Sequence, residues 1–301
     1  MRLRQIQNFV TVVEKGSIRA AARELRVSQP AITKSVRSLE AELHVQLVQR
    51  TPHGVVPTEA GRLFFARARV AHAELRKAEQ ELAQADSDGG GKVAFGVGPV
   101  TAVLIAPQAI TRFHHQFPRV RARVIEGFAP DLLPLVRDGS LDFAVGPRVE
   151  GKLDPGLAFR PLFREGFAVV ARKGHPLRHT RSLAELVDAD WLSFGGSGLP
   201  NGPLERVFSS AGLPVPRQVV QCDSYNIVVS VLAATDMLGV IARRMLASPL
   251  ARECLDEIPV VERPPMLTVG LFVRTDPPLT QLAAAMAKAV TEVARTLARP
   301  A

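Results

Sequence analysis

The hydrophobic pattern of this 301-residue chain changes period at a run of three glycines, Gly89 to Gly91. Before the glycines, apolar residues recur at spacings of three and four, which is typical of amphipathic helices. After them, short strand-like runs alternate with helical patterns, which is typical of an α/β domain. One hydrophobic core rarely spans a chain of this length, so we expect at least two domains, with residues 87–91 as the hinge between them.

Three helical patterns and a turn-rich segment fill the first 58 residues. The helices are expected at residues 1–16, 18–26 and 30–43, each with an apolar stripe. Ser17 and Ser28 stand where an N-cap is favoured, and Pro30 follows in a first turn, where its missing N–H would have no partner. Residues 47–58 form two short extended pieces around a Pro-His-Gly turn, which predicts a two-stranded wing. The segment therefore predicts a winged helix-turn-helix domain over residues 1–58.

The third helix carries polar side chains opposite its apolar stripe. In a helix-turn-helix, the N-terminal residues of the second helix reach base edges in the DNA major groove. Glutamine pairs with adenine there, threonine and proline touch thymine methyl groups, and lysine and arginine reach guanine or phosphate. The predicted DNA-binding residues, two of them on the wing, are Ser28, Gln29, Pro30, Thr33, Lys34, Arg37, Arg50 and His53. The alternative is a solvated polar face on a small helical bundle.

The distribution of charge favours DNA as the partner of this domain. The net charge is +9, and residues 1–70 hold twelve Lys or Arg against five Asp or Glu, so most of the excess is N-terminal. Two cysteines form no disulfide framework, and no long apolar run or cleavable signal opens the chain. We therefore expect a cytoplasmic protein without a membrane partner.

Residues 59–86 predict one long helix. Its apolar residues step alternately by four and three over three heptads, at Phe64, Ala68, Ala71, Leu75, Ala78, Leu82 and Ala85. Such a seam is typical of two helices that pack together, so we expect a homodimer through this linker helix. The alternative is a helix that lies on its own domain.

The second module contains only incomplete versions of catalytic or metal-binding motifs. The stretch GVGPVT at 96–101 lacks the third glycine of a dinucleotide loop, and GGSGL at 195–199 lacks the closing glycine of a nucleophile elbow. The neighbouring His114 and His115 would point about 100° apart on a helix and make a poor chelate. We expect no catalytic residues, no metal and no cofactor.

Several turns that follow predicted strands share glycines, hydroxyl groups and one cation. Such turns form ligand crevices at the carboxyl ends of strands, where helix N-termini offer N–H donors. The predicted effector-binding residues are Gly98, Pro99, Thr101, Phe128, Pro147, Arg148, Ser193, Gly196, Ser197, Ser224, Tyr225 and Asn226. These donors favour a small carboxylate or sulfonate with an apolar or aromatic body. The alternative is that these residues only meet the needs of short turns.

The stretch SIRAAARELRVSQPAITKSVRSLEAELHVQLVQRTPHGVVPTEAG, residues 17–61, resembles the DNA-binding domain of the LysR-type transcriptional regulators. The family pattern contains S-x-x-x-A-A-x-x-L-x-x-S-Q-x-A and, further on, L-E-x-x-L and T-x-A-G. This chain departs from it at Thr33, where serine is usual, and at Val48, where phenylalanine is usual. Residues 92–301 are similar to the family's effector domain, which is like a type 2 periplasmic binding protein.

The resemblance implies a bacterial transcriptional regulator that binds double-stranded operator DNA, contacts RNA polymerase and assembles as a homotetramer. It also implies an effector cleft between two α/β subdomains, which we expect at residues 92–162 with 267–301 and at residues 163–266. Two alternatives stay open: a DNA-binding protein that responds to no ligand, and an α/β enzyme fused to a DNA-binding head. The effector, the operator, and whether the target is activated or repressed do not follow from the sequence.

Overall fold

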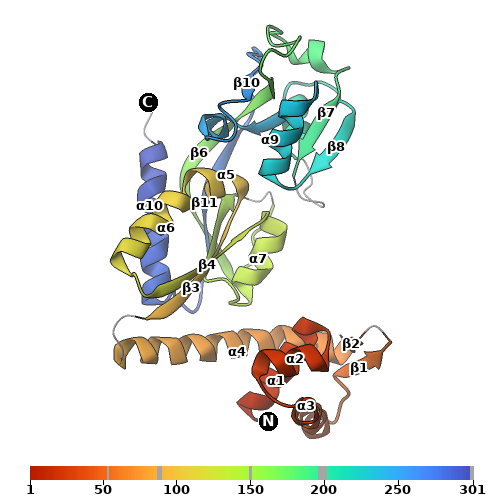
Figure 1. The fold of residues 1–301 in the computed structure, drawn as a ribbon, viewed down its shortest axis with the longest axis vertical. Coiled ribbons are helices and arrows are strands. Elements are labelled where there is room, and N and C mark those ends of the chain that lie inside the picture. The colour runs from red at the N-terminus through yellow and green to blue at the C-terminus, as the bar shows by residue number, and fades with distance from the viewer. Residues whose placement is uncertain (53, 87–89, 149–150, 196–201, 299–301) are drawn as a thin grey trace. The chain divides into compact units, whose positions relative to one another are not determined.

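The computed structural model describes residues 1–52, 54–86, 90–148, 151–195 and 202–298. The chain divides into two compact units, one of residues 1–87 with 137–140 and one formed by the remainder (Figure 1). Three predicted site residues, His53, Gly196 and Ser197, lie outside the described residues. None of the helices in the described ranges is long and apolar enough to cross a membrane.

The first unit confirms the predicted winged helix-turn-helix and long helix. Its elements are α1 (Leu3–Lys15), α2 (Ile18–Leu25), α3 (Gln29–Leu43), β1 (Val48–Thr51), β2 (Gly54–Pro57) and α4 (Glu59–Asp86). The α1 helix ends at Gly16 in the left-handed conformation, and the Ser17 and Ser28 hydroxyls accept backbone N–H bonds as N-caps of α2 and α3. The helices meet at a core that includes Phe9, Ile32 and Leu39.

The predicted seam of α4 divides between two environments. Phe64 and Ala68 pack against the core of their own unit, with the Phe64 ring centroid 5.4 Å from that of Phe9. Leu75 and Leu82, further along the helix, are 46% and 71% exposed. The first two positions of the seam therefore pack on the helix's own domain, as the alternative interpretation expects. The later leucines are exposed to solvent in the single chain.

The second unit is an α/β structure built on one mixed sheet. Its elements are β3 (Gly91–Val97), α5 (Pro99–Leu104), α6 (Ala106–Gln116), β4 (Val120–Glu126), α7 (Ala129–Arg137), β5 (Phe143–Pro147), β6 (Leu157–Arg172), η1 (Leu183–Leu186), β7 (Trp191–Phe194), α8 (Pro203–Ser210), β8 (Gln218–Cys222), α9 (Tyr225–Ala234), β9 (Leu238–Ala242), η2 (Arg243–Ala247), β10 (Leu255–Glu257), β11 (Met266–Arg274) and α10 (Gln281–Ala298). Gly91, expected in the hinge, already belongs to β3.

The sheet passes through both subdomains. Its strand order is β4-β3-β5-β11-β6-β9-β7-β8, with β10 paired to β6. The long strand β6 pairs with β11 over its first part and with β9 and β10 over its last part. Where β6 pairs with β11, Leu162 of β6 is the extra residue of a bulge opposite Val269 and Gly270, at the boundary expected between the subdomains.

Separate hydrophobic cores support the two subdomains. In the first, α6 and α10 lie side by side on one face of the sheet, and α7 covers the other face (Figure 1). In the second, α9 packs in one cluster and α8 in another, on opposite faces of β6 and β9. In the first subdomain, the carboxyl ends of the parallel strands β3 and β4 lead into the turns that precede α5 and α7.

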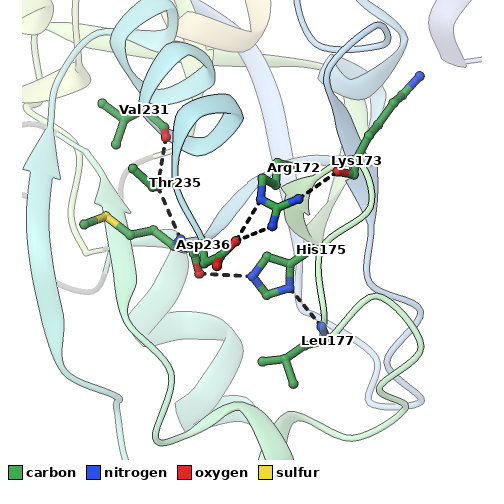
Figure 2. A network of polar contacts seen from close by, with 8 residues as sticks. Arg172, Lys173, His175, Leu177, Val231, Thr235 and Asp236 are labelled. Atoms are coloured by element: carbon green, nitrogen blue, oxygen red, sulfur yellow. Dashed lines mark hydrogen bonds and ion pairs between the residues drawn. The ribbon is translucent and has the colours of Figure 1, made fainter.

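A polar network holds two turns of the second subdomain together (Figure 2). The buried His175 accepts a bond from the Leu177 N–H through Nδ1, and its Nε2 lies 3.0 Å from the Asp236 carbonyl oxygen. Because a carbonyl only accepts, the neutral imidazole carries its proton on Nε2. The Arg172 guanidinium pairs with the Asp236 carboxylate at 2.7 Å. His175 is therefore a structural residue with both ring nitrogens in use.

Candidate nucleic-acid interface and ligand cavity

The outer face of α3 forms a shallow depression together with the wing. It is lined by Gln29, Pro30, Thr33, Lys34, Arg37, Ser38 and Arg50. Six of these residues were predicted from the sequence, and Ser38 was missed although it lies four residues beyond Lys34, on the same side of the helix. Ser28 lies at the start of α3, where its hydroxyl accepts the Ala31 N–H. The side chains of the depression include hydrogen-bonding groups and the cations Lys34, Arg37 and Arg50, which a surface that binds DNA requires.

Two amides of α1 join the apolar core in holding α3. The Asn8 Nδ2 donates to the Ser35 hydroxyl at 2.8 Å, and the Gln5 Nε2 donates to the Ser38 hydroxyl at 3.1 Å. Both amide side chains are buried, at 7% exposure, so these bonds satisfy groups that would otherwise be costly. On the inner side of α3, Ile32 belongs to the core. The amide bonds from α1 and the packing of Ile32 together fix the orientation of the outer face of α3.

Hydrogen bonds from backbone N–H groups hold both strands of the wing. The Glu40 carboxylate accepts the N–H groups of Leu47 and Val48, at 2.8 and 3.1 Å, where the chain enters β1. In β2, the Val55 N–H donates to the Gly16 carbonyl at 2.8 Å. A Cβ at Gly54 would lie 2.4 Å from that same carbonyl oxygen, so the close approach requires glycine. Arg50 is consequently carried on a hairpin with a defined position beside α3.

A cavity of about 150 Å³ lies where the two subdomains meet. Its lining is Gly98, Pro99, Gly127, Phe128, Ala129, Leu132, Leu133, Ala144, Val145, Gly146, Pro147, Arg148, Phe167, Gly202, Pro203, Arg206, Leu267 and Phe272. Five of the predicted effector residues are among them: Gly98, Pro99, Phe128, Pro147 and Arg148. The lining is otherwise mainly apolar, and it extends beneath α7, which the sequence did not indicate.

Two predicted residues give the cavity its aromatic and cationic character. The Phe128 ring packs edge-on against Phe194 of the second subdomain, with centroids 5.9 Å apart. The Arg148 guanidinium lies 5.9 Å from the centroid of the Phe159 ring, and the Arg148 N–H donates to the Thr268 carbonyl at 2.8 Å. The cavity therefore combines an apolar interior with two arginines, Arg148 and Arg206, in its lining, which suits an organic anion.

The predicted hydroxyl groups are placed differently. Thr101 is fully buried on α5, and its hydroxyl has no partner among the described residues. Ser193 is buried in β7, Ser224 is the N-cap residue of α9, and Asn226 is exposed. None of these four contributes to the cavity lining that the described ranges form.

The prediction for Tyr225 needs correction. Its hydroxyl donates to the Met245 carbonyl at 2.9 Å and lies 3.0 Å from the Ser248 hydroxyl, inside the core of the second subdomain. Burial raises the pKa of this phenol. The sequence placed Tyr225 at the start of a helix that follows a strand end, but the ring points inward because α9 buries that side. Tyr225 is an internal anchor.

The described residues provide no metal-binding group of three or more His, Cys, Asp or Glu side chains. Burial, with a contribution from the Asp223 charge, raises the pKa of the Cys222 thiol and so disfavours the thiolate that a nucleophile requires.

Comparison with family models decides the class of protein. The family model described as "LysR substrate binding domain" matches residues 87–295, and "Bacterial regulatory helix-turn-helix protein, lysR family" matches residues 3–62. The chain belongs to the LysR family. As a LysR-family protein it is a DNA-binding transcriptional regulator with an effector-binding domain, and not an enzyme.

Curated proteins named HTH-type transcriptional regulators are similar to this chain over most of its length. GalR of Pseudomonas putida is 30% identical over 97% of this chain and 75% of its own length, and GbpR of Azospirillum brasilense is 31% identical over 100% and 90%. Among solved structures, a full-length OxyR variant from Pseudomonas aeruginosa has a TM-score of 0.71 and 22% identity, covering 96% of this chain and 94% of that one. Full-length CbnR complexed with its target DNA has a TM-score of 0.69 and 19% identity, over 97% and 100%. These two structures share the fold.

The two departures from the LysR pattern keep their positions in the structure. Thr33 lines the depression on α3, where it presents a hydroxyl as the usual serine would. Val48, where phenylalanine is usual, is half-buried at the start of β1 and packs against the core.

Proposed function

We propose that this LysR-family regulator places α3 in the major groove of its operator, with the wing against the DNA backbone, and that a small organic anion in the cavity alters those contacts. The proposal includes a homodimer through α4, a homotetramer, contact with RNA polymerase and action in the cytoplasm. One observation carries the choice of effector: the mainly apolar cavity with Arg148 at its lining. The unpartnered Thr101 hydroxyl is a candidate second donor, reached if the ligand or a water extends toward α5.

The two kinds of DNA contact should respond differently to mutation. Gln29→Ala is expected to cost about 1–3 kcal/mol on the operator, because a base-reading amide is lost, and to relax preference at one base pair. Arg50→Ala should weaken operator and mixed-sequence DNA alike, and make the salt dependence shallower by about 0.9, because one phosphate contact is lost. Fluorescence anisotropy, with an operator selected from a random duplex pool, measures both. Equal effects of the two substitutions on both DNAs would contradict this division.

The charge of the effector can be tested with matched small probes. We expect benzoate or benzenesulfonate to raise the melting temperature of the full chain, while neutral benzamide and cationic benzylamine do not. Arg148→Gln should weaken binding of the anion by about tenfold, since hydrogen bonds to charged groups contribute about 1.5–3 kcal/mol. Thr101→Val, which removes the hydroxyl at nearly constant volume, tests the second donor by calorimetry. Stabilisation by benzamide or benzylamine alone would rule out an anion site.

A further inference from the structure

Ser38 differs from the other residues of the depression because its hydroxyl already accepts a hydrogen bond from the Gln5 amide. It lies on α3 one turn beyond Lys34, is exposed, and shares the depression with Arg50 of the wing. In a helix that enters the major groove with its N-terminal turn, residues further along are closer to the sugar-phosphate backbone than to base edges. The partner available to Ser38 in that position is a phosphate oxygen, which only accepts hydrogen bonds.

The neighbouring groups determine which way the Gln5 amide points. The Gln5 side chain reaches the Glu42 carboxylate at 2.9 Å and the Ser38 hydroxyl at 3.1 Å through the same atom, and its other atom faces the Arg2 N–H at 2.5 Å. An ionised carboxylate only accepts and a backbone N–H only donates, so the atom facing Glu42 must be Nε2. The bond from Gln5 holds the pKa of the Glu42 carboxyl below its usual range, which keeps it ionised.

The orientation of Gln5 determines that of Ser38. Because Nε2 donates, the Ser38 oxygen accepts, and the hydroxyl proton is directed away from Gln5. A helical serine often uses that proton on the carbonyl one turn back. Thr11 does so toward Gln7 at 2.9 Å, but between the described residues Ser38 and Lys34 no such bond is present. The proton of Ser38 is thus available on the exposed side, within the depression.

We infer that Ser38 donates a hydrogen bond to a DNA phosphate and that Gln5, held by Glu42, is the positioning residue that aims it. The inference rests on the proposed placement of α3 in the major groove. Ser38 and Arg50 would then both contact the DNA backbone, Ser38 as a neutral donor and Arg50 as a cation. Gln5 lies behind α3 and contacts the DNA only through Ser38.

The chain offers a matched control for this pair. Asn8 donates to Ser35 as Gln5 donates to Ser38, from the same helix to the same helix one turn apart. Ser35 is half-buried and does not line the depression. Ser35→Ala therefore removes an equivalent bond between α1 and α3 without removing a donor from the DNA-facing side.

The experiment measures binding of the full chain to a mixed-sequence duplex by fluorescence anisotropy at several salt concentrations. Ser38→Ala is expected to weaken binding by about tenfold, the effect of a hydrogen bond to a charged group, and Ser38→Thr should restore it. Gln5→Met should weaken binding too, but not further in the Ser38→Ala background. The salt dependence should stay unchanged in each variant, because a neutral donor releases no counterion, whereas a displaced helix would lose Lys and Arg contacts and flatten it.

The result that would overturn the inference is unchanged binding by Ser38→Ala, or equal losses from Ser38→Ala and Ser35→Ala. An additive loss when Gln5→Met is combined with Ser38→Ala would also overturn the role of Gln5. Lys34→Ala and Arg50→Ala separate this failure from that of the proposed function. If they weaken binding while Ser38→Ala does not, only the serine contact is wrong; if they too have no effect, the placement of α3 is wrong.

Discussion

Replacing Gly61 by alanine is expected to unfold the DNA-binding unit while the effector unit remains folded. A Cβ at this position would lie 1.9 Å from the Leu47 carbonyl oxygen and 2.9 Å from its carbon, both of them backbone atoms. That carbonyl already accepts the Thr58 N–H at 3.0 Å, and the Thr58 hydroxyl caps α4 through the Gly61 N–H at 2.9 Å. The added methyl must therefore push apart the start of β1 and the start of α4.

The expected cost is about 3 kcal/mol or more, in the range of strongly destabilising substitutions, because the clashing atoms cannot rotate away. Thermal unfolding should show an early transition for the first unit, and DNA binding should be lost with it. Gly90→Ala is the control, because a Cβ at Gly90 meets nothing within 4 Å. Normal melting and DNA binding by Gly61→Ala would show that the junction of wing and linker helix is more open than described.

The elements of the first unit were predictable from the sequence, but the contacts between them were not. The apolar spacings of its helices, the serine caps and the wing each depend on short-range chemistry, and the structure begins α3 at Gln29 where the pattern indicated Pro30. The contacts that join these elements were not predictable. Nothing in the local pattern shows that Glu40 holds the first residues of the wing, or that Gln5 reaches Ser38 across 33 positions.

In the second unit, the missed elements have identifiable physical causes. The first part of β6 contains Pro161, which lacks the N–H that a central strand needs. In the structure Pro161 lies opposite Gly270, next to the bulge at Leu162 of β6, where the ladder is already irregular. The edge strand β8 has the sequence Gln-Val-Val-Gln-Cys, in which apolar and polar residues do not alternate. Its Gln218 and Val219 are both exposed. The helix α10 was not predicted either, although its buried side completes the core of the first subdomain.

The residues that line the cavity between the two subdomains were named from the sequence only in part. Turns at the carboxyl ends of strands are recognisable in the sequence, and three residues from such turns, Gly98, Phe128 and Arg148, are part of the lining. Its floor is made by α7 and the sheet, where Gly96 leaves room for Leu132: a Cβ on Gly96 would lie 2.9 Å from the Leu132 Cδ2. The space under α7 depends on pairs of residues such as Gly96 and Leu132, which are distant in sequence and therefore not recognisable from a local pattern.

Charging the exposed part of the α4 seam is expected to separate the proposed dimer and reduce operator affinity by about a hundredfold or more, because two linked half-site contacts become independent. Leu75→Glu with Leu82→Glu places like charges where two copies would meet, at side chains that are 46% and 71% exposed in the single chain. Phe64 and Ala68 are unsuitable for this test, since they belong to the core of their own unit.

Sedimentation velocity and anisotropy on the operator measure the two consequences together. The control is Ala66→Glu with Ala73→Glu, which adds the same charge to the opposite side of α4 and should leave both the assembly and the affinity intact. Because the substituted leucines lie beyond the core of the first unit, the monomer should remain folded and bind mixed-sequence DNA through one copy of α3. Loss of affinity without a change in sedimentation would mean that the leucines contact something other than a second α4. A smaller species with undiminished operator affinity would mean that one copy suffices for recognition, and the operator would then need no repeated half-site.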